Sequence, residues 1–303
     1  MSLHALYDLP APAKLNMFLH VVGRRPDGYH LLQSPFVMID WADTLHFELR
    51  DDGRLQRHDL GPALPADDLC LRAARALQGA SGGTAGADIH IQKHVPWGAG
   101  MGGGSSDAAT TLLALNRLGG LNWPRARLAE LGLKLGADVP FFIGGRNAFV
   151  EGVGELLRPM DWPERCYAVV KPAAALPTRE IFGHPLLRRD TEAVIVAGSL
   201  EEARGSGVSA AWVQRFVDGY GHNDLQPPAE DRCPEVAQAA SWLADRHGNS
   251  RMTGSGSAVF SRVGMVASPR ATDPAAGFQG LPAGWVGRMC RSLVQHPLAG
   301  WAG

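Results

Sequence analysis

The sequence lacks several features that would each point to a particular class of protein. Lys and Arg number 29 against 30 Asp and Glu, so no basic excess is present to bind a polynucleotide through counterion release. No apolar run approaches the ~20 residues that a membrane-spanning helix needs. The first residues, MSLHALYDLPAPAKLN, lack the charged and then apolar order of a signal peptide. We therefore expect no nucleic-acid partner, no membrane association and a location in the cytoplasm.

Cysteine and metal-binding patterns are also scarce. His90 and His94 have the spacing of a zinc-binding helix, but the surrounding DIHIQKHV alternates as a strand does and no HExxH occurs. Scattered cysteines fit neither a CxxC metal site nor a dense disulfide framework, so we expect them to be reduced and structural. The four cysteines are Cys70, Cys166, Cys233 and Cys290.

What the sequence does contain is a glycine-rich loop between a strand-like and a helix-like stretch. Five glycines fall within residues 96–106. Glycine allows the positive φ angles that such a loop needs and lets main-chain N–H groups approach an anion closely. The helix that follows adds free N–H groups and a positive dipole end, so the sequence predicts a site for nucleotide phosphates. The loop consists of Pro96, Trp97, Gly98, Ala99, Gly100, Met101, Gly102, Gly103, Gly104, Ser105 and Ser106.

Several known phosphate loops can be compared with this one. A Walker loop requires a Lys after its glycines, and none is present. Gly98, Gly100 and Gly103 satisfy the dinucleotide-binding pattern GxGxxG, but the acidic residue expected about 20 positions later is replaced by helix-like sequence. Protein kinases would add VAIK, HRD and DFG elements, which are missing. The loop therefore belongs to another kind of nucleotide site.

Strand-like and helix-like segments are mixed without regular βαβ alternation, which favours an α+β fold. Residues 14–22 predict one strand, and Ser105 or Ser106 is expected to cap the helix after the glycine loop. Residues 233–247 predict an amphipathic helix. The DWPE stretch after Met160 predicts a boundary between two domains, 1–160 and 161–303.

Three segments together resemble the GHMP kinases, a family of small-molecule kinases. PAKLN at 12–16 resembles the first motif of that family, the glycine loop the second and MTGSGSAVF at 252–260 the third, all in the same order. The resemblance implies a two-domain α+β fold, with an N-terminal domain like domain 2 of ribosomal protein S5 and a ferredoxin-like C-terminal domain. It also implies ATP as co-substrate and Mg²⁺.

Three further segments are similar to those GHMP kinases whose substrate carries a cytidine diphosphate group. They are GRRPDGYHLLQSPF at 23–36, LGADVPFF at 135–142 and KPAAALPTREIF at 171–182. The similarity implies phosphorylation of the 2-hydroxyl of a cytidine-diphosphate-linked methylerythritol, in the non-mevalonate isoprenoid route.

The same resemblance implies roles for individual residues. Lys14 and Asp138 match the catalytic pair, although alone they would also suit a strand-edge lysine and a turn or cap aspartate. Met101 replaces the usual Leu, and Asp68 stands where the family pattern has an Asn near the adenine. Tyr29 and Phe182 are implied to hold the cytosine, His30 to bind its polar edge, Asn16 and Thr178 to contact the diphosphate or erythritol, Phe36 to line the pocket, and Ser106 to bind Mg²⁺.

Two alternatives remain open from the sequence. One is a GHMP kinase that acts on mevalonate or homoserine, which carry no base and would not need the 23–36 segment. The other is a non-catalytic nucleotide-binding relative, which would be free to lose Lys14 or Asp138. The protein is expected to be a monomer or a homodimer, and its partner a small molecule.

Overall fold

The structure is a computed structural model that describes residues 3–196, 207–264 and 277–302. Within these residues the first half of the chain forms a seven-stranded sheet, with the order β4-β5-β3-β6-β7 and with β1 and β2 both paired to β3. Its strands are β1 Ala5–Asn16, β2 His20–Arg24, β3 His30–Arg50, β4 Leu55–Asp59, β5 Gly86–Gln92, β6 Ala148–Gly152 and β7 Leu156–Pro159.

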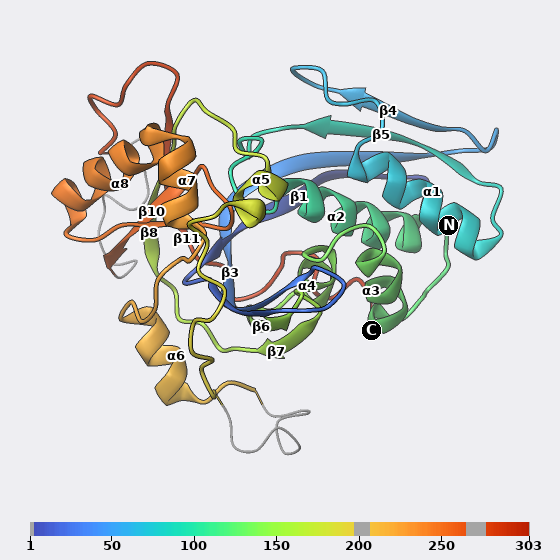
Figure 1. Cartoon of the computed structure of the whole chain (residues 1–303). Helices are drawn as coiled ribbons and strands as arrows, with labels where there is room; N and C mark the ends of the chain where they lie inside the picture. Colours follow the sequence, from blue (N-terminus) through green and yellow to red (C-terminus); the bar gives the residue numbers. More distant parts are fainter. Residues whose placement is uncertain (1–2, 197–206, 265–276, 303) are drawn as a thin grey trace.

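The long strand β3 organises this sheet, because it pairs with β1, β2, β5 and β6 along its length. From Asp40 to Glu48 its side chains alternate between buried and more exposed, the period expected where one face of a sheet covers a core. Helices pack on that buried face, as Figure 1 shows for α1 and α2. The helices are α1 Leu69–Ser81, α2 Gly103–Leu118, α3 Arg125–Leu133 and α4 Val139–Gly144.

A second, four-stranded sheet occupies the other half of the described chain, with the order β11-β8-β10-β9. Its neighbouring strands are antiparallel, and α8 packs against β8, β9 and β10. The elements are β8 Cys166–Lys171, α5 Thr178–Gly183, α6 Ala210–Val217, α7 Gln226–Arg232, α8 Pro234–His247, β9 Arg251–Met252, β10 Val259–Gly264 and β11 Val286–Arg291.

A buried apolar cluster joins the two sheets. It contains Leu15 and Ile39 from the first sheet and Tyr167, Val169 and Phe260 from the second, each at most 3% exposed. Burial of large side chains is worth roughly 1.5–3 kcal/mol apiece. The cluster therefore fixes the position of the two halves relative to each other, and with it the geometry of any site that lies between them.

The end of the chain returns to the first half. Leu293 N donates to Met38 O at 2.8 Å and His296 N to Gly145 O at 2.9 Å, and Leu298 is buried in the core under the large sheet. The sheets change between β7 and β8, close to the predicted border at 160/161. The exact border stays a prediction. Residues from 292 onward pack against the N-terminal half of the chain, although they follow the C-terminal half in sequence.

Two local predictions from the sequence are wrong. The strand expected over 14–22 is broken, because β1 ends at Asn16 and β2 begins at His20. Neither Ser105 nor Ser106 caps α2, since Gly102 occupies that position with φ 70° and makes no side-chain hydrogen bond. The apolar composition of 14–22 hides the break, and the helix begins inside the glycine run.

Two other predictions, the helix over 233–247 and free, structural cysteines, are confirmed. The helix expected over 233–247 is α8, and the four cysteines are free and buried. His90 lies in β5, and the described residues contain no group of three or more His, Cys, Asp or Glu side chains that could hold a metal ion. Among the described helices none is long and apolar enough to cross a membrane.

Candidate active site

Lys14 lies near the end of β1, where the strand reaches the glycine loop. Its backbone N donates to Met101 O at 2.9 Å, and its ammonium donates to Gly100 O at 3.2 Å. The ammonium also lies 4.5 Å from the centre of the Phe36 ring, a cation–π distance. The lysine is therefore attached to the loop by both its main chain and its side chain.

Asn16 holds the same ammonium from within the strand. Its Oδ1 accepts from Lys14 Nζ at 2.6 Å, and its Nδ2 donates to Ser34 Oγ at 2.8 Å. Thr253, from the turn between β9 and β10, accepts from Asn16 N at 2.9 Å. Because Asn16 is 1% exposed and bonded at both ends of its amide, it fixes the position of Lys14.

Asp138 completes this group from the start of α4, where it is the N-cap residue but makes no side-chain cap bond. Its Oδ2 lies 3.5 Å from Lys14 Nζ, and its side chain is 29% exposed against 4% for the lysine. Burial lowers the pKa of Lys14 below the ordinary lysine value, and the neighbouring carboxylate offsets part of that change. An ammonium has three donors, and Asn16 and Gly100 occupy two, so the third is available on the Asp138 side.

The glycine loop has the backbone geometry that its composition predicts. Gly98, Gly100 and Gly102 all have positive φ, at 64°, 72° and 70°. A Cβ on Gly100 would lie 2.9 Å from Gly256 N and nearer still to Thr253 O, and one on Gly254 would lie 3.0 Å from Gly100 Cα. Two glycine turns that are about 150 residues apart in the sequence are thus in backbone contact, which only glycine permits.

Hydrogen bonds link the same two turns. Ser257 N donates to Gly98 O and Ala258 N to Ala99 O, both at 3.2 Å. Asn223 supports the second turn from behind, because its Nδ2 donates to Met252 O at 2.8 Å and Gly254 O at 2.9 Å. The loop is therefore held in shape by residues of both halves of the chain.

One cavity of about 340 Å³ lies beside the loop. It brings together most of the residues that the sequence analysis selected, from both halves of the protein. Its lining includes Lys14, Asn16, Phe36, Asp138, Thr178, Phe182 and loop residues 96–105.

Ser105 lines this cavity, whereas Ser106 does not and is fully buried. Ser106 Oγ has no hydrogen-bond partner among the described residues. A hydroxyl from either serine suits Mg²⁺, which takes oxygen ligands and keeps several waters. The sequence analysis selected Ser106 as the Mg²⁺ ligand, but the serine that the cavity exposes is its neighbour Ser105.

Two of the residues selected for the base, His30 and Phe182, lie next to each other at α5. The rings of His30 and Phe182 have centroids 5.1 Å apart and an interplanar angle of 32°. Thr178 Oγ1 lies 2.8 Å from Ser255 Oγ, which ties the start of α5 to the second glycine turn. Tyr29 is 65% exposed, and neither it nor His30 is among the residues that line the cavity.

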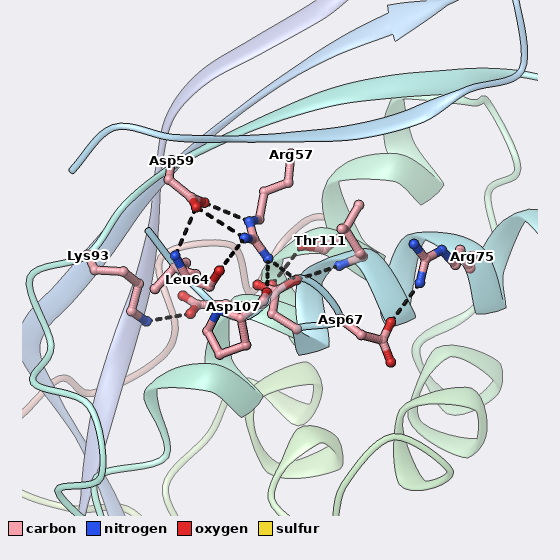
Figure 2. A network of polar contacts seen from close by, with 11 residues as sticks. Arg57, Asp59, Leu64, Asp67, Arg75, Lys93, Asp107 and Thr111 are labelled. Carbon is pink, nitrogen blue, oxygen red and sulfur yellow. Dashed lines mark hydrogen bonds and ion pairs between the residues drawn. The ribbon is translucent and has the colours of Figure 1, made fainter. Parts of the chain in front are cut away.

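Asp68 has a structural role in place of a cavity contact. Its Oδ1 accepts from Leu71 N at 3.1 Å, which caps α1, and also lies 2.9 Å from Arg57 Nη1. Figure 2 shows the surrounding network, in which Arg57 also binds Asp59 and Leu64. Asp68 is not among the residues that line the cavity.

A buried cluster of Lys93, Asp43 and Asp107 lies next to the glycine loop and binds the main chain that precedes it. Lys93 lines the cavity, and its ammonium binds Asp107 Oδ2 at 2.5 Å (Figure 2) and Asp43 Oδ2. Asp43 Oδ1 accepts from His94 N at 2.6 Å and Val95 N at 2.8 Å, directly before the glycine loop. Burial raises the pKa of Asp107 well above its usual value. The single ammonium of Lys93 pairs with both buried acidic side chains.

Sequence reasoning gave no role to several residues that shape this site. Ser34 lies in the 23–36 segment and Asn223 lies outside the segments that resemble the family, and both bind residues that are distant in the sequence. Arg189 follows α5 in a stretch without a recognisable motif, yet its side chain contacts His30. Only the folded chain shows these contacts.

Family models match both halves of the chain. The model described as GHMP kinases N terminal domain matches residues 68–146, and the one described as GHMP kinases C terminal matches residues 208–271. A protein of Methylibium petroleiphilum named 4-diphosphocytidyl-2-C-methyl-D-erythritol kinase is 62% identical over 303 residues, covering 100% of both chains. The chain belongs to the GHMP kinase family.

Other comparisons agree with this membership. A Variovorax paradoxus protein of the same name is 55% identical to this GHMP kinase and covers 98% of it and 99% of its own length. The crystal structure of a 4-(cytidine 5′-diphospho)-2C-methyl-D-erythritol kinase has a TM-score of 0.70 at 33% identity, covering 93% of this chain and 98% of that one.

A homoserine kinase from Cytophaga hutchinsonii has a TM-score of 0.67 at 16% identity, covering 98% of this chain and 96% of that one, and is similar in fold alone. The two-domain α+β GHMP kinase fold predicted from the sequence is confirmed.

Proposed function

We propose that this GHMP kinase transfers the γ-phosphoryl group of ATP to the 2-hydroxyl of 4-(cytidine 5′-diphospho)-2-C-methyl-D-erythritol, in the non-mevalonate route to isoprenoid precursors. Relatives that are 51–62% identical carry the name of the kinase for this substrate. The observation that supports the proposal most is that one cavity is lined by the glycine loop, by the Lys14–Asp138 pair and by Thr178 and Phe182. A phosphate loop, a reacting pair and a base pocket are the three parts that this reaction requires.

In the proposed reaction the substrate oxygen attacks the γ-phosphorus, the bond to the β–γ bridging oxygen breaks, and ADP leaves. Asp138 accepts the hydroxyl proton. Lys14 neutralises charge on the transferred group. Its hydrogen bonds to Asn16 Oδ1 and Gly100 O favour a fixed position for the ammonium. Phosphoryl transfer has a loose transition state, so positioning and charge neutralisation supply most of the catalysis.

At the ATP end, the proposal assigns the phosphates to loop residues 96–106 and to the first turn of α2. The N-terminus of a 16-residue helix and the positive-φ glycines together favour anions. Mg²⁺ would be held mainly by the phosphates, with Ser105 or Ser106 as the protein oxygen, and would neutralise charge on them when bound.

At the other end, we assign the cytosine to Tyr29, His30 and Phe182. An exposed Tyr29 ring and a Phe182 ring on the cavity wall support stacking, which every base tolerates. Thr178 and Phe36 are proposed to line the erythritol and diphosphate region. Asn16 is proposed to act there mainly through Lys14, because both ends of its amide are occupied.

Two substitutions test the reacting pair. We expect Asp138→Asn and Lys14→Ala each to lower kcat by about two orders of magnitude or more, the usual scale for losing acid–base or electrostatic help. Lys134→Ala, in an exposed residue, and Asp161→Asn, whose side chain is 94% exposed, are matched controls and should leave kcat unchanged. Turnover near the wild-type value in either site variant would refute the assignment.

A coupled assay of ADP release with Mg-ATP and a set of acceptors tests the substrate. Activity should appear with the cytidine-diphosphate-linked acceptor and not with mevalonate or homoserine. Turnover only with mevalonate or homoserine would refute the substrate assignment. Tight ATP binding without turnover on any acceptor would instead favour a non-catalytic relative.

A further inference from the structure

Arg189 lies beside the proposed cytosine pocket and is held rigidly. Its guanidinium donates to three main-chain carbonyl groups, Leu187 O at 3.0 Å, Phe182 O at 3.0 Å and His184 O at 3.2 Å. The backbone on either side is anchored as well, since Leu187 and Thr191 are buried and Thr191 N donates to Val21 O at 3.1 Å. A side chain with this many fixed bonds has a defined direction for its Nε–H.

Arg189 Nε, which is not bound by these carbonyl groups, lies 3.1 Å from His30 Nε2 and donates to it. A guanidinium only donates and stays protonated at any ordinary pH, so the imidazole nitrogen that faces it has to supply a lone pair. A neutral imidazole carries its single proton on the other nitrogen. The contact therefore selects the tautomer of His30 with the proton on Nδ1.

The neutral form is favoured by the surroundings. Burial lowers the pKa of His30, and so do the charges of Arg189 and of Arg24. Within the described part of the chain, Nδ1 has no hydrogen-bond partner. The ring consequently offers a ligand one donor and no acceptor, next to the Phe182 ring.

We propose that Arg189 is a specificity-determining positioning residue: by fixing His30 as an Nδ1–H donor, it makes the pocket accept cytosine and reject uracil. The inference rests on the proposed function, because it takes the cytidine base to bind beside His30 and Phe182. Arg189 itself does not touch the substrate.

The selectivity follows from the chemistry of the two pyrimidines. N3 of cytosine is an acceptor and matches an Nδ1–H donor, whereas N3 of uracil carries a hydrogen and meets the same donor with another donor. A buried pair of opposed donors loses a hydrogen bond and leaves both groups unsatisfied. Without Arg189, the ring is free to move its proton to Nε2 and to present a lone pair to uracil.

The test compares two substrates with one enzyme. For wild type and Arg189→Met, kcat/KM is measured with the cytidine-diphosphate-linked methylerythritol and with its uridine-diphosphate analogue. We expect the ratio of the two values to fall by about tenfold or more in the variant, the scale on which polar groups left unpaired reject an analogue. The ratio is independent of the concentration of folded enzyme, so a loss of stability does not imitate the effect.

The neighbouring arginine provides a matched control. Arg188 has a side chain that is 63% exposed and pairs with Asp190, so Arg188→Met should keep the wild-type ratio. An unchanged ratio in Arg189→Met, or an equal fall in Arg188→Met, would overturn the inference.

A further variant separates this inference from the proposed function. If His30→Ala raises KM for the cytidine substrate while Arg189→Met leaves the ratio unchanged, the base pocket stands and only the role of Arg189 is wrong. If His30→Ala leaves KM unchanged, the proposed base pocket fails and the inference fails with it. The tautomer is read directly from ¹⁵N spectra of histidine-labelled enzyme, in which we expect the His30 proton on Nδ1 in wild type and a mixture in Arg189→Met. A proton on Nε2 in wild type would overturn the inference.

Discussion

Replacing Gly100 by alanine would test whether the phosphate loop depends on contact with the second glycine turn. Two separate costs are expected. Gly100 has φ 72°, a conformation that costs an L-residue roughly 1–2 kcal/mol. Its new Cβ would also lie 2.9 Å from Gly256 N and closer to Thr253 O, both of them main-chain atoms that cannot rotate away. Overpacking of this kind adds about 1–3 kcal/mol.

Gly120 offers a control for the first cost alone. It has φ 62°, and a Cβ placed on it would have no atom within 4 Å. Gly120→Ala should therefore lower the free energy of unfolding by roughly 1–2 kcal/mol, and Gly100→Ala by about 2–5 kcal/mol. Chemical denaturation of the two variants and wild type measures both values.

Measurement of kcat/KM for ATP separates an effect on the glycine loop from a general loss of stability. A shift of the loop by about 1 Å misplaces both the phosphates and Lys14, so kcat/KM for ATP should fall by about 100-fold in Gly100→Ala. It should be unchanged in Gly120→Ala. If the two variants lose equal stability and both keep the wild-type kcat/KM, the contact between the turns does not shape the site and the reasoning is wrong.

Two further predictions concern buried charges. Lys93→Met leaves the buried side chains of Asp43 and Asp107 without their cation and should lower the free energy of unfolding by about 3–5 kcal/mol. Lys134→Met, in an exposed residue, should change it little, and urea denaturation measures both values. Burial lowers the pKa of His20 and of His296 to about 4 from 6.5, so both are neutral in the folded protein and the unfolded chain takes up protons first. Stability should therefore fall as the pH drops from about 6.5 to about 4, by up to about 3 kcal/mol per histidine, and an unfolding free energy that is constant over this range would contradict the assignment.

The sequence predicted well wherever the signal is local. The glycine loop, Lys14 and Asp138 occur in short motifs whose order along the chain identifies the family, and the structure brings them to one cavity. Amphipathic periodicity likewise predicted α8, since only the residues of one helix determine that pattern.

The sequence predicted poorly where distant segments decide the structure. The break between β1 and β2 follows from pairing of both strands with β3, which no pattern within 14–22 records. Asp68 interacts with Arg57 because β4 packs against α1. Arg189 contacts His30, which is 159 residues away in the sequence. No periodicity or spacing in the sequence predicts hydrogen bonds between such distant residues.

The contact between the two glycine turns has a consequence for ATP binding at the proposed phosphate site. Lys14, Ser257 and Ala258 already hold the main chain of the loop in place, through bonds to Met101, Gly98 and Ala99. A loop that is ordered before the nucleotide arrives loses little conformational entropy on binding, so more of the interaction energy appears as affinity. In the proposed site, nucleotide would therefore enter a preorganised loop that does not need to close over it.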